Sequence, residues 1–310
     1  MPSAGAMLPG AAVGLDIGPI ATSIDARWLM AYAAAVGEED ARFFDTGAPA
    51  GPTAHPLFAV CYEWPALVAI REKVVPPALG LRGVHATHRL VVHRPPRAGD
   101  TLFTTARITR VEPRATGTLL VVELATVDRA GTPVTTTEHG SVFRGVPTDV
   151  PTTRAPGRVV TDVPIAREPR RVITDMSAAP PRGLSGDDSH GAHAEWVETI
   201  PIAAGAAHVY SECARIWNPI HTDIAVARAA GLPGIILHGT ATLALAVSRI
   251  VARELGGDPG RVREVGVRFT GMVRLESSVT VHGQRDGNVL RFRAADTAGA
   301  AVLSEGVVTS

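Results

Sequence analysis

Two stretches of the chain carry the same order of apolar patterns. In the first, apolar residues recur at helical spacing over residues 25–37 and 65–80. Four strand-like runs follow, at residues 87–93, 100–112, 118–128 and 133–145. The second stretch has a strand-like run at 196–202, helical patterns at 203–216 and 240–255, and strand-like runs at 263–271, 277–284, 289–296 and 300–309. Each stretch therefore predicts a central helix beside antiparallel strands, an α+β fold.

A local repeat indicates that the two stretches arose by duplication. The sequence Asp-Arg-Ala-Gly at residues 128–131 joins two strand-like runs, and Asp-Thr-Ala-Gly at residues 296–299 joins two others. In both places a valine follows three residues after the glycine, at Val134 and Val302. A shared turn at the same point of both patterns is what a duplicated unit leaves behind.

A tract rich in proline and arginine divides the two stretches. From residue 146 to 193 it shows little helical or strand periodicity, which is typical of a linker. We therefore predict a first domain at residues 1–145, a linker at 146–193 and a second domain at 194–310. Arg167, Arg170 and Arg171 are interpreted as solvated linker charges.

Composition and charge exclude several classes of protein. Hydrophobic residues make up 45% of the 310 residues, which is ample for packed cores and excludes a disordered chain. Thirty Lys and Arg balance thirty Asp and Glu, so the basic excess of a nucleic-acid binder is absent. Cys61 and Cys213 form no disulfide framework. We expect no signal peptide, no membrane span and a cytoplasmic location.

The densest chemical information lies between Tyr210 and Thr242. Asn218-Pro219 ends a helical pattern, so His221 is expected on a turn, where an imidazole can transfer protons near neutral pH. Asp223 is placed to cap the short helix that follows. Gly239 comes at the start of the apolar helix, where free backbone N–H groups can hold the carbonyl oxygen of a thioester.

Other polar residues invite simpler interpretations. Tyr210 and Trp217 are read as packing residues that can also line an acyl pocket, and His238 as a structural residue. His85, His88 and His93 are residues of a type that binds metals, but on a regular strand successive members of this set point to opposite faces. We therefore expect no metal site.

Two motifs bring out a family resemblance. Residues 218–223, Asn-Pro-Ile-His-Thr-Asp, resemble the N-P-(aliphatic)-H-x-D stretch of the MaoC-like, type-2 (R)-specific enoyl-CoA hydratases and dehydratases. Residues 236–239, Ile-Leu-His-Gly, resemble the I-(L/V)-H-G stretch of the same family. The first half is similar to the degenerate N-terminal unit of such proteins, at residues 93–102 and 140–145. The resemblance implies a double hotdog, with two central helices each wrapped by an antiparallel sheet and the sheets joined edge to edge.

The resemblance also implies an active site and exposes a departure from it. In this family an aspartate and a histidine flank a water beside a 2-enoyl thioester, and a backbone amide at the helix start holds the thioester carbonyl. His221, Asn218 and Gly239 carry over as the histidine, its companion asparagine and the amide donor. At the position of the aspartate this chain has Ile216, preceded by Arg215 where the family has glycine.

Three explanations of Ile216 remain open. Another acid can replace the aspartate, and the candidates are Glu212, Asp223 and Glu63. His221 can act alone. The third possibility is an acyl-thioester pocket without hydratase chemistry, used for cyclisation, for isomerisation or only for binding.

The sequence thus predicts a hydro-lyase that interconverts 2-enoyl and 3-hydroxyacyl thioesters. The substrate is expected on coenzyme A or an acyl carrier protein, in a pocket between the halves lined by Ile216, Trp217, Tyr210 and His238. No cofactor is expected, and a homodimer is compatible with the fusion of two units.

Overall fold

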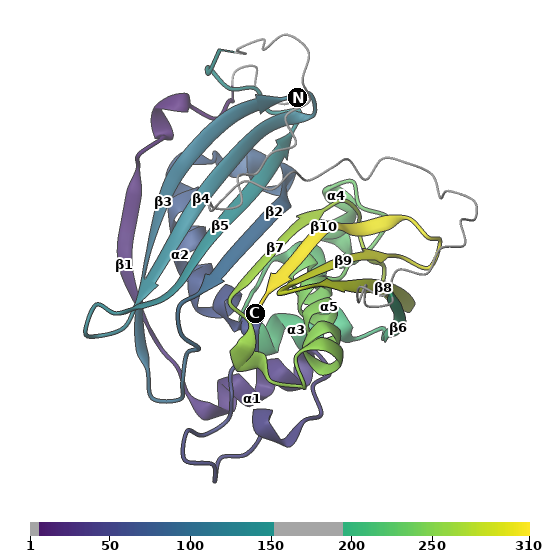
Figure 1. Ribbon diagram of the computed structural model, residues 1–310. Coiled ribbons are helices and arrows are strands. Elements are labelled where there is room, and N and C mark those ends of the chain that lie inside the picture. Colours follow the sequence, from purple (N-terminus) through teal and green to yellow (C-terminus); the bar gives the residue numbers. More distant parts are fainter. Residues whose placement is uncertain (1–5, 152–194) are drawn as a thin grey trace.

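The strands form one continuous antiparallel sheet. The computed structural model describes residues 6–151 and 195–310, and within them the strand order is β1-β3-β4-β5-β2-β7-β10-β9-β8-β6 (Figure 1). The first half supplies β1 (Asp16–Ser23), β2 (Gly83–Val92), β3 (Thr101–Arg114), β4 (Gly117–Val127) and β5 (Pro133–Arg144). The second half supplies β6 (Trp196–Ile202), β7 (Glu264–Phe269), β8 (Ser277–Asp286), β9 (Val289–Ala295) and β10 (Ala301–Thr309).

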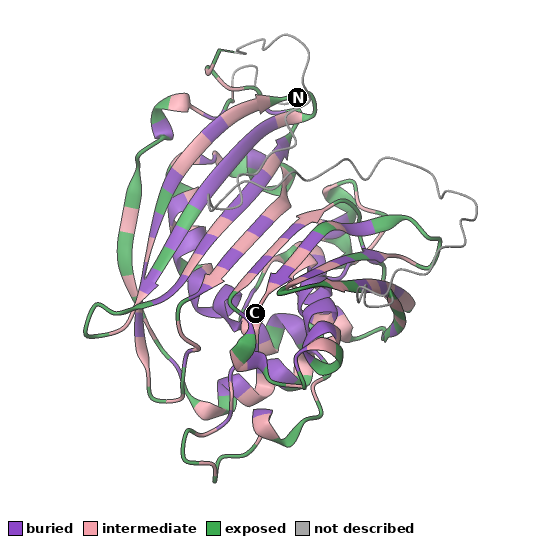
Figure 2. Cartoon of the chain, in the orientation of Figure 1, coloured by how far each residue is buried: buried purple, intermediate pink, exposed green. Residues whose placement is uncertain are grey.

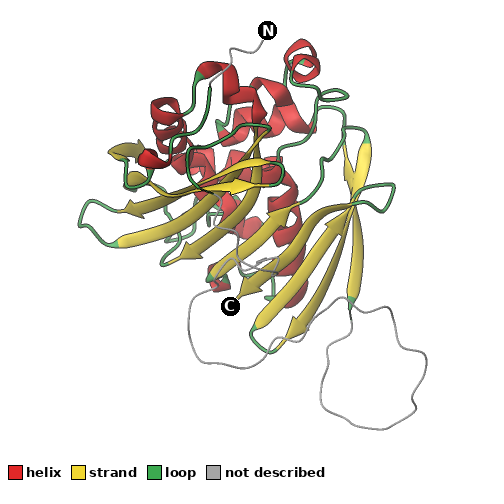
Figure 3. Cartoon of the chain, turned by 90° about the horizontal axis from the view of Figure 1, so that it is seen from above, coloured by secondary structure: helices red, strands yellow, loops and turns green. Residues whose placement is uncertain are grey.

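The helices gather on one face of this sheet (Figure 3). The two long central helices are α2 (Ala59–Val74) in the first half and α5 (Gly239–Glu254) in the second. The shorter helices are α1 (Ala26–Ala35), α3 (Ala206–Ala214) and α4 (Ile224–Ala229). Buried residues line the central helices and alternate along the strands, so the core lies between the helices and the sheet (Figure 2). The predicted α+β architecture, with two central helices and two sheets joined at an edge, is confirmed.

The position of α2 corrects one prediction. The apolar pattern placed this helix at residues 65–80, with Pro65 at the start, where proline is favoured. Instead α2 begins six residues earlier, at Ala59, and continues through Pro65 to Val74. Packing against the core keeps the helix intact across the proline, whose own preference is for the first turn.

The repeated turn has the same geometry in both halves. Asp128 Oδ1 accepts hydrogen bonds from the N–H groups of Ala130 (2.9 Å) and Thr132 (3.0 Å). Asp296 Oδ1 accepts the equivalent pair from Ala298 and Ala300, both at 2.9 Å. Each turn needs a positive φ, and a glycine provides it, with φ of 79° at residue 131 and 80° at residue 299. This conservation of detail supports duplication.

The two halves meet along the ladder between β2 and β7. Five residue pairs run from Thr87 opposite Arg268 to Val91 opposite Glu264. Arg89 adds an ion pair across this ladder, with Nε 2.7 Å from Glu264 Oε1. Helices α1 and α3 pack together on the helical face, where the indole N–H of Trp28 donates to the carbonyl of Cys213 at 2.9 Å. The two halves are thus joined both by strand pairing in the sheet and by contacts between helices.

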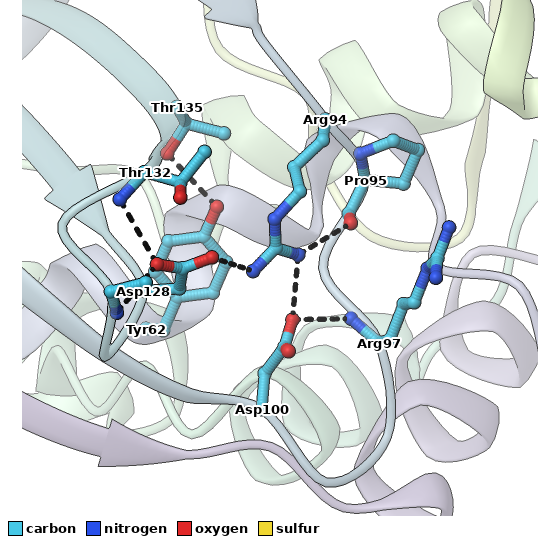
Figure 4. A network of polar contacts seen from close by, with 9 residues as sticks. Tyr62, Arg94, Pro95, Arg97, Asp100, Asp128, Thr132 and Thr135 are labelled. Atoms are coloured by element: carbon cyan, nitrogen blue, oxygen red, sulfur yellow. Dashed lines mark hydrogen bonds and ion pairs between the residues drawn. The ribbon is translucent and has the colours of Figure 1, made fainter.

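One arginine ties together the loops at an end of the first half. Arg94 Nη1 donates to Asp100 Oδ2 at 2.8 Å, and Arg94 Nη2 donates to Asp128 Oδ2 at 3.1 Å (Figure 4). The connection between β2 and β3 is thereby fixed to the turn between β4 and β5. Nearby, Thr135 Oγ1 lies 2.9 Å from the hydroxyl of Tyr62.

Most of the predicted linker, residues 152–193, lies outside the described residues, and so does residue 194. Its first residues are held against the first half: the N–H of Leu8 donates to the carbonyl of Pro147 at 3.0 Å, and Val146 is buried. The division at residues 145 and 194 stays a prediction.

Candidate active site

His221 lies on the short 3-10 turn Pro219–His221, as the Asn-Pro sequence predicted. Its Nδ1 is 2.9 Å from the carbonyl oxygen of Ile236. A carbonyl can only accept, so Nδ1 carries the proton and Nε2 is left as the basic nitrogen. Burial lowers the pKa of His221 to about 4, so the ring is neutral at neutral pH. The side chain is thus set up as a proton acceptor.

His238 packs against the ring of His221. The two rings stack with centroids 3.7 Å apart and planes 23° from parallel. His238 Nε2 lies 3.2 Å from the hydroxyl of Ser211, and Tyr210 packs beside the ring at 4.9 Å. Burial, followed by the neighbouring His221, lowers the pKa of His238. This residue has the packing of a structural support, as the sequence suggested.

Gly239 is the first residue of α5, and His238 is its N-cap without a side-chain cap. The N–H groups of a helix start have no partner in their own helix and carry partial positive charge. A Cβ at position 239 would lie 3.1 Å from the ring of Phe269. Glycine therefore lets the helix start pack closely against this ring without a side chain over its N–H groups. The arrangement provides a donor for a carbonyl oxygen in the wall of a cavity.

A cavity of about 420 Å³ connects the two halves. His221, Asn218, Ile216, His238 and Gly239 line it from the second half. Helix α2 and strands β2 and β5 line it from the first. The predicted location of the pocket between the halves therefore agrees with the geometry, and Ile216 adds an apolar side chain to its wall.

The structure corrects two of the expected pocket residues. Tyr210 is buried beneath the cavity wall, where its hydroxyl donates to Thr240 Oγ1 at 3.0 Å. Trp217 is 61% exposed and lies outside the lining. The chain reverses just before it, at Arg215 with φ of 58°, so the indole is turned towards solvent. Tyr210 packs the core, and Trp217 lies at the surface.

Neither acid proposed from the motif lines the cavity. Glu212 is exposed, and because α3 ends at Ala214 no continuous helix places it on the face of Ile216. Asp223 is the N-cap of α4, accepting from the N–H groups of Ala225 and Val226 at 2.8 and 3.2 Å. The predicted cap is confirmed, and it holds that carboxylate at the surface.

Within the part of the chain that the structure describes, Glu63 is the one carboxylate in the lining of this cavity. It projects from α2, is 2% exposed, and accepts hydrogen bonds on Oε1 from the hydroxyls of Thr135 (3.0 Å) and Thr137 (2.9 Å). Burial raises the pKa of Glu63 to about 8, against the lowering effect of the two hydroxyls. At neutral pH the side chain is therefore a carboxylic acid with a proton to give.

The cavity also holds three histidines that sequence reasoning did not bring together. His85 and His88 were expected on opposite faces of a strand, but the register of β2 shifts between His85 and Thr87. This bulge turns both rings to the same side, where His139 of β5 joins them, and their nitrogens lie within 4.8 Å of one another. His93 lies apart, exposed and 3.0 Å from Thr136 Oγ1.

Solved structures with a similar fold include MaoC-like and double hotdog proteins. The chain has a TM-score of 0.71 to a MaoC-like dehydratase from Phytophthora capsici, at 20% identity over 97% of this chain and 96% of that one. A Mycobacterium tuberculosis protein with a double hotdog fold gives 0.59 at 17% identity, over 96% and 95%. The fold is thus the double hotdog.

The sequence itself divides between two families. Residues 166–306 match the MaoC like domain, and residues 11–137 match the FAS1-like dehydratase domain region. The first half is thus similar to a dehydratase region and the second half to the MaoC like domain, within one double hotdog fold.

Curated relatives match over shorter stretches. Enoyl-CoA hydratase ChsH3 of Mycobacterium tuberculosis is 36% identical over 110 residues, which are 35% of this chain and 38% of that protein. A fatty acid synthase subunit beta of Aspergillus oryzae is 41% identical over 95 residues, 27% of this chain and 5% of that protein. The chain thus spans well under half of these relatives. Among the described helices, none has the length and apolar character that crossing a bilayer requires.

Proposed function

We propose that this protein adds water reversibly to 2-enoyl thioesters, giving 3-hydroxyacyl thioesters. The observation that carries the proposal is the meeting of His221, the start of α5 at Gly239 and Glu63 in the wall of one cavity. His221 is neutral and basic at Nε2, whereas Glu63 is protonated. The pair therefore offers a base and an acid at the same pH, as addition of water requires.

The reaction balances with these groups alone. The amide of Gly239 binds the thioester oxygen and stabilises the negative charge that develops there. His221 Nε2 removes a proton from water while the water oxygen bonds to C3 of the substrate. The electron pair of the C2=C3 bond moves to C2, which takes the proton from Glu63. The proton on His221 then returns to Glu63 through solvent, and dehydration follows the same steps backwards.

The substrate is proposed to enter as a thioester of coenzyme A or of an acyl carrier protein. Two of the curated relatives are named enoyl-CoA hydratases, and others are fatty acid synthase subunits, so both kinds of carrier fit the chemistry. We propose a cytoplasmic location for the same metabolism and a monomer or homodimer as the working state.

Ile216 favours a second candidate, a pocket that binds acyl thioesters without hydrating them. The residue is 5% exposed and forms an apolar part of the cavity wall, so it cannot hold a water or accept a proton. In this case the site is proposed to direct an isomerisation or cyclisation, or only to bind.

Hydration of short and medium 2-enoyl-CoA thioesters, followed by loss of the enoyl absorbance, separates the two candidates. The hydratase proposal predicts turnover that falls in His221→Ala and in Glu63→Gln, with His93→Ala as a control outside the cavity. Turnover that survives in His221→Ala would overturn the assigned base. Absence of turnover, together with tight binding of saturated acyl-CoA, would replace hydration by the second candidate.

A further inference from the structure

The described residues give the cavity lining more positive than negative charge. Arg71, Arg82 and Arg144 all line it, and Glu63, the single carboxylate that residues 6–151 and 195–310 bring to the lining, is protonated at neutral pH. Arg82 and Arg144 are exposed at the rim, where water screens them. Arg71 lies deeper. A net cationic cavity in a chain with no net charge indicates an anionic ligand.

Arg71 has no acidic partner among the described residues. It lies two turns after Glu63 on α2, half-buried, with its guanidinium 5.5 Å from the centre of the Phe143 ring. One of its Nη atoms packs against Gly83, 3.0 Å from where a Cβ would be. Burial without a counter-charge lowers the pKa of Arg71. A guanidinium held in this way is costly unless something negative binds to it.

The histidines extend this polar surface along the sheet. In the register of β2 and β5, Gly83 lies opposite Phe143, His85 opposite Ser141, and His88 opposite His139. Along β2, the imidazoles of His85 and His88 therefore come next after the position where the guanidinium of Arg71 packs. His85 Nε2 and both ring nitrogens of His88 are buried without a hydrogen-bond partner among the described residues. Each neutral ring has one N–H, and His85 can donate from its unpaired Nε2 in the tautomer that carries the proton there.

The positive charge of Arg71 favours an anion over a metal cation as the ligand of these imidazoles. Three imidazoles with nitrogens within 4.8 Å are a possible metal site. However, the positive charge of Arg71 acts on both His85 and His139, and the described residues place no ionised carboxylate in the cavity lining beside them. A divalent cation would be repelled there, whereas an anion would gain the guanidinium and the unpaired N–H groups together.

This surface lies next to the site of reaction. The ring of His85 is 4.3 Å from the ring of Phe269. The ring of Phe269 also lies against Gly239, whose Cβ position would be 3.1 Å from it. The residue whose amide would hold the thioester oxygen and the imidazole of His85 thus contact the same phenyl ring. A group bound at both places would be a few carbon atoms long.

We propose that Arg71 and His85 form an anion subsite inside the cavity that binds a carboxylate at the far end of a short acyl chain. The inference rests on the proposed acyl-thioester function and narrows its substrates to thioesters of short dicarboxylic acids. The same chemistry would also suit a phosphate of coenzyme A, so the test has to separate the two sources.

Calorimetric binding of saturated thioesters tests the subsite without needing turnover. The ligands are N-acetylcysteamine thioesters, which have no phosphate, in pairs of equal length: succinyl with butanoyl, and glutaryl with pentanoyl. We expect the carboxylate member to bind roughly ten- to a hundredfold more tightly to the wild type, as a charge-assisted hydrogen-bonded pair provides. Arg71→Met should abolish this preference and leave the neutral member unchanged.

Three further measurements complete the design. Arg71→Lys keeps the charge and should retain part of the preference, and Arg107→Met, on the exposed surface of β3, should retain all of it. Circular dichroism reports whether Arg71→Met is folded. Equilibrium dialysis with Zn²⁺ is expected to give no uptake that depends on His88.

The outcomes bear separately on the subsite and on hydration. Equal binding of both members to the wild type would overturn the subsite. If Arg71→Met weakens only coenzyme A thioesters, the anion is a phosphate and the dicarboxylic assignment is wrong. Stoichiometric Zn²⁺ lost in His88→Ala would replace the anion by a metal. A carboxylate preference without hydration of any 2-enoyl thioester would leave the subsite standing and refute the hydratase.

Discussion

Tyr32 of α1 and Tyr210 of α3 meet at the junction of the two halves, with hydroxyls 3.5 Å and ring centres 5.7 Å apart. Each ring also lies beside a histidine that caps a helix: Tyr32 beside His55 at 5.6 Å, and Tyr210 beside His238 at 4.9 Å. The two tyrosines therefore have similar surroundings, each beside a histidine at the start of a helix.

The two tyrosines precede different residues at the same offset. Six residues after Tyr210 the chain has Ile216, and six residues after Tyr32 it has Glu38. Glu38 Oε1 lies 3.6 Å from His55 Nε2, and burial raises the pKa of this carboxyl. At this offset the first half therefore has an acid beside a histidine, and the second half has an apolar residue in the cavity wall.

Replacing His221 by alanine should lower the rate of hydration roughly 10²–10⁴-fold, the range for loss of one general base. The fold should survive, because His221 makes one side-chain hydrogen bond, to the carbonyl of Ile236. Steady-state rates with crotonyl-CoA measure the effect. An unchanged rate would remove His221 from the mechanism.

The pH dependence should follow the two groups in opposite directions. His221 is active when neutral, so activity rises with pH through about 4. Glu63 is active when protonated, so activity falls as pH passes about 8. A bell-shaped profile of kcat/KM is expected, and Glu63→Gln should lose the alkaline limb along with most of its rate. An alkaline limb that persists in this variant would belong to another group.

Glu63 should also make stability depend on pH. Its folded pKa is raised above the unfolded value, so the folded state holds this proton more tightly. The contribution is fully present below about pH 4, the unfolded value, and is lost as pH rises through about 8. Between pH 6 and 9 the wild type should lose Tm relative to Glu63→Gln. Parallel melting curves of the two proteins would refute this.

Arg215 should be strained in its left-handed conformation. Its φ of 58° favours glycine, and its guanidinium stacks over Trp28 at 4.0 Å. Arg215→Ala loses the stacking and keeps the strain, whereas Arg215→Gly loses both. We expect the glycine variant to be more stable than the alanine variant by about 1 kcal/mol in urea unfolding. The reverse order would show that position 215 tolerates a side chain without strain.

Sequence pattern predicted those features that depend on neighbouring residues. The Asn-Pro turn of His221, the cap at Asp223 and the helix start at Gly239 follow from local chemistry, and the structure has them as expected. The paired turns at Asp128 and Asp296 also depend on a few adjacent residues.

Features formed by distant residues were beyond the reach of the pattern. Glu63 meets Thr135 and Thr137 because α2 packs on β5, more than seventy residues later. His85 joins His139 only because a bulge in β2 changes the direction of its side chains. No sequence period records such a bulge. Glu63, a polar residue after Cys61-Tyr62, was a candidate acid from the sequence, but the two threonines that hold it could not be predicted.

The ladder between β2 and β7 has a consequence for how the protein can be assembled. These hydrogen bonds, with the packing of α1 on α3, join the halves without any need for the chain between them. Residues 1–151 and 195–310 produced as two polypeptides should therefore associate into one complex. In the intact chain the connection sets a high effective concentration of one half for the other, so that the cavity stays complete at dilutions where two separate chains would part.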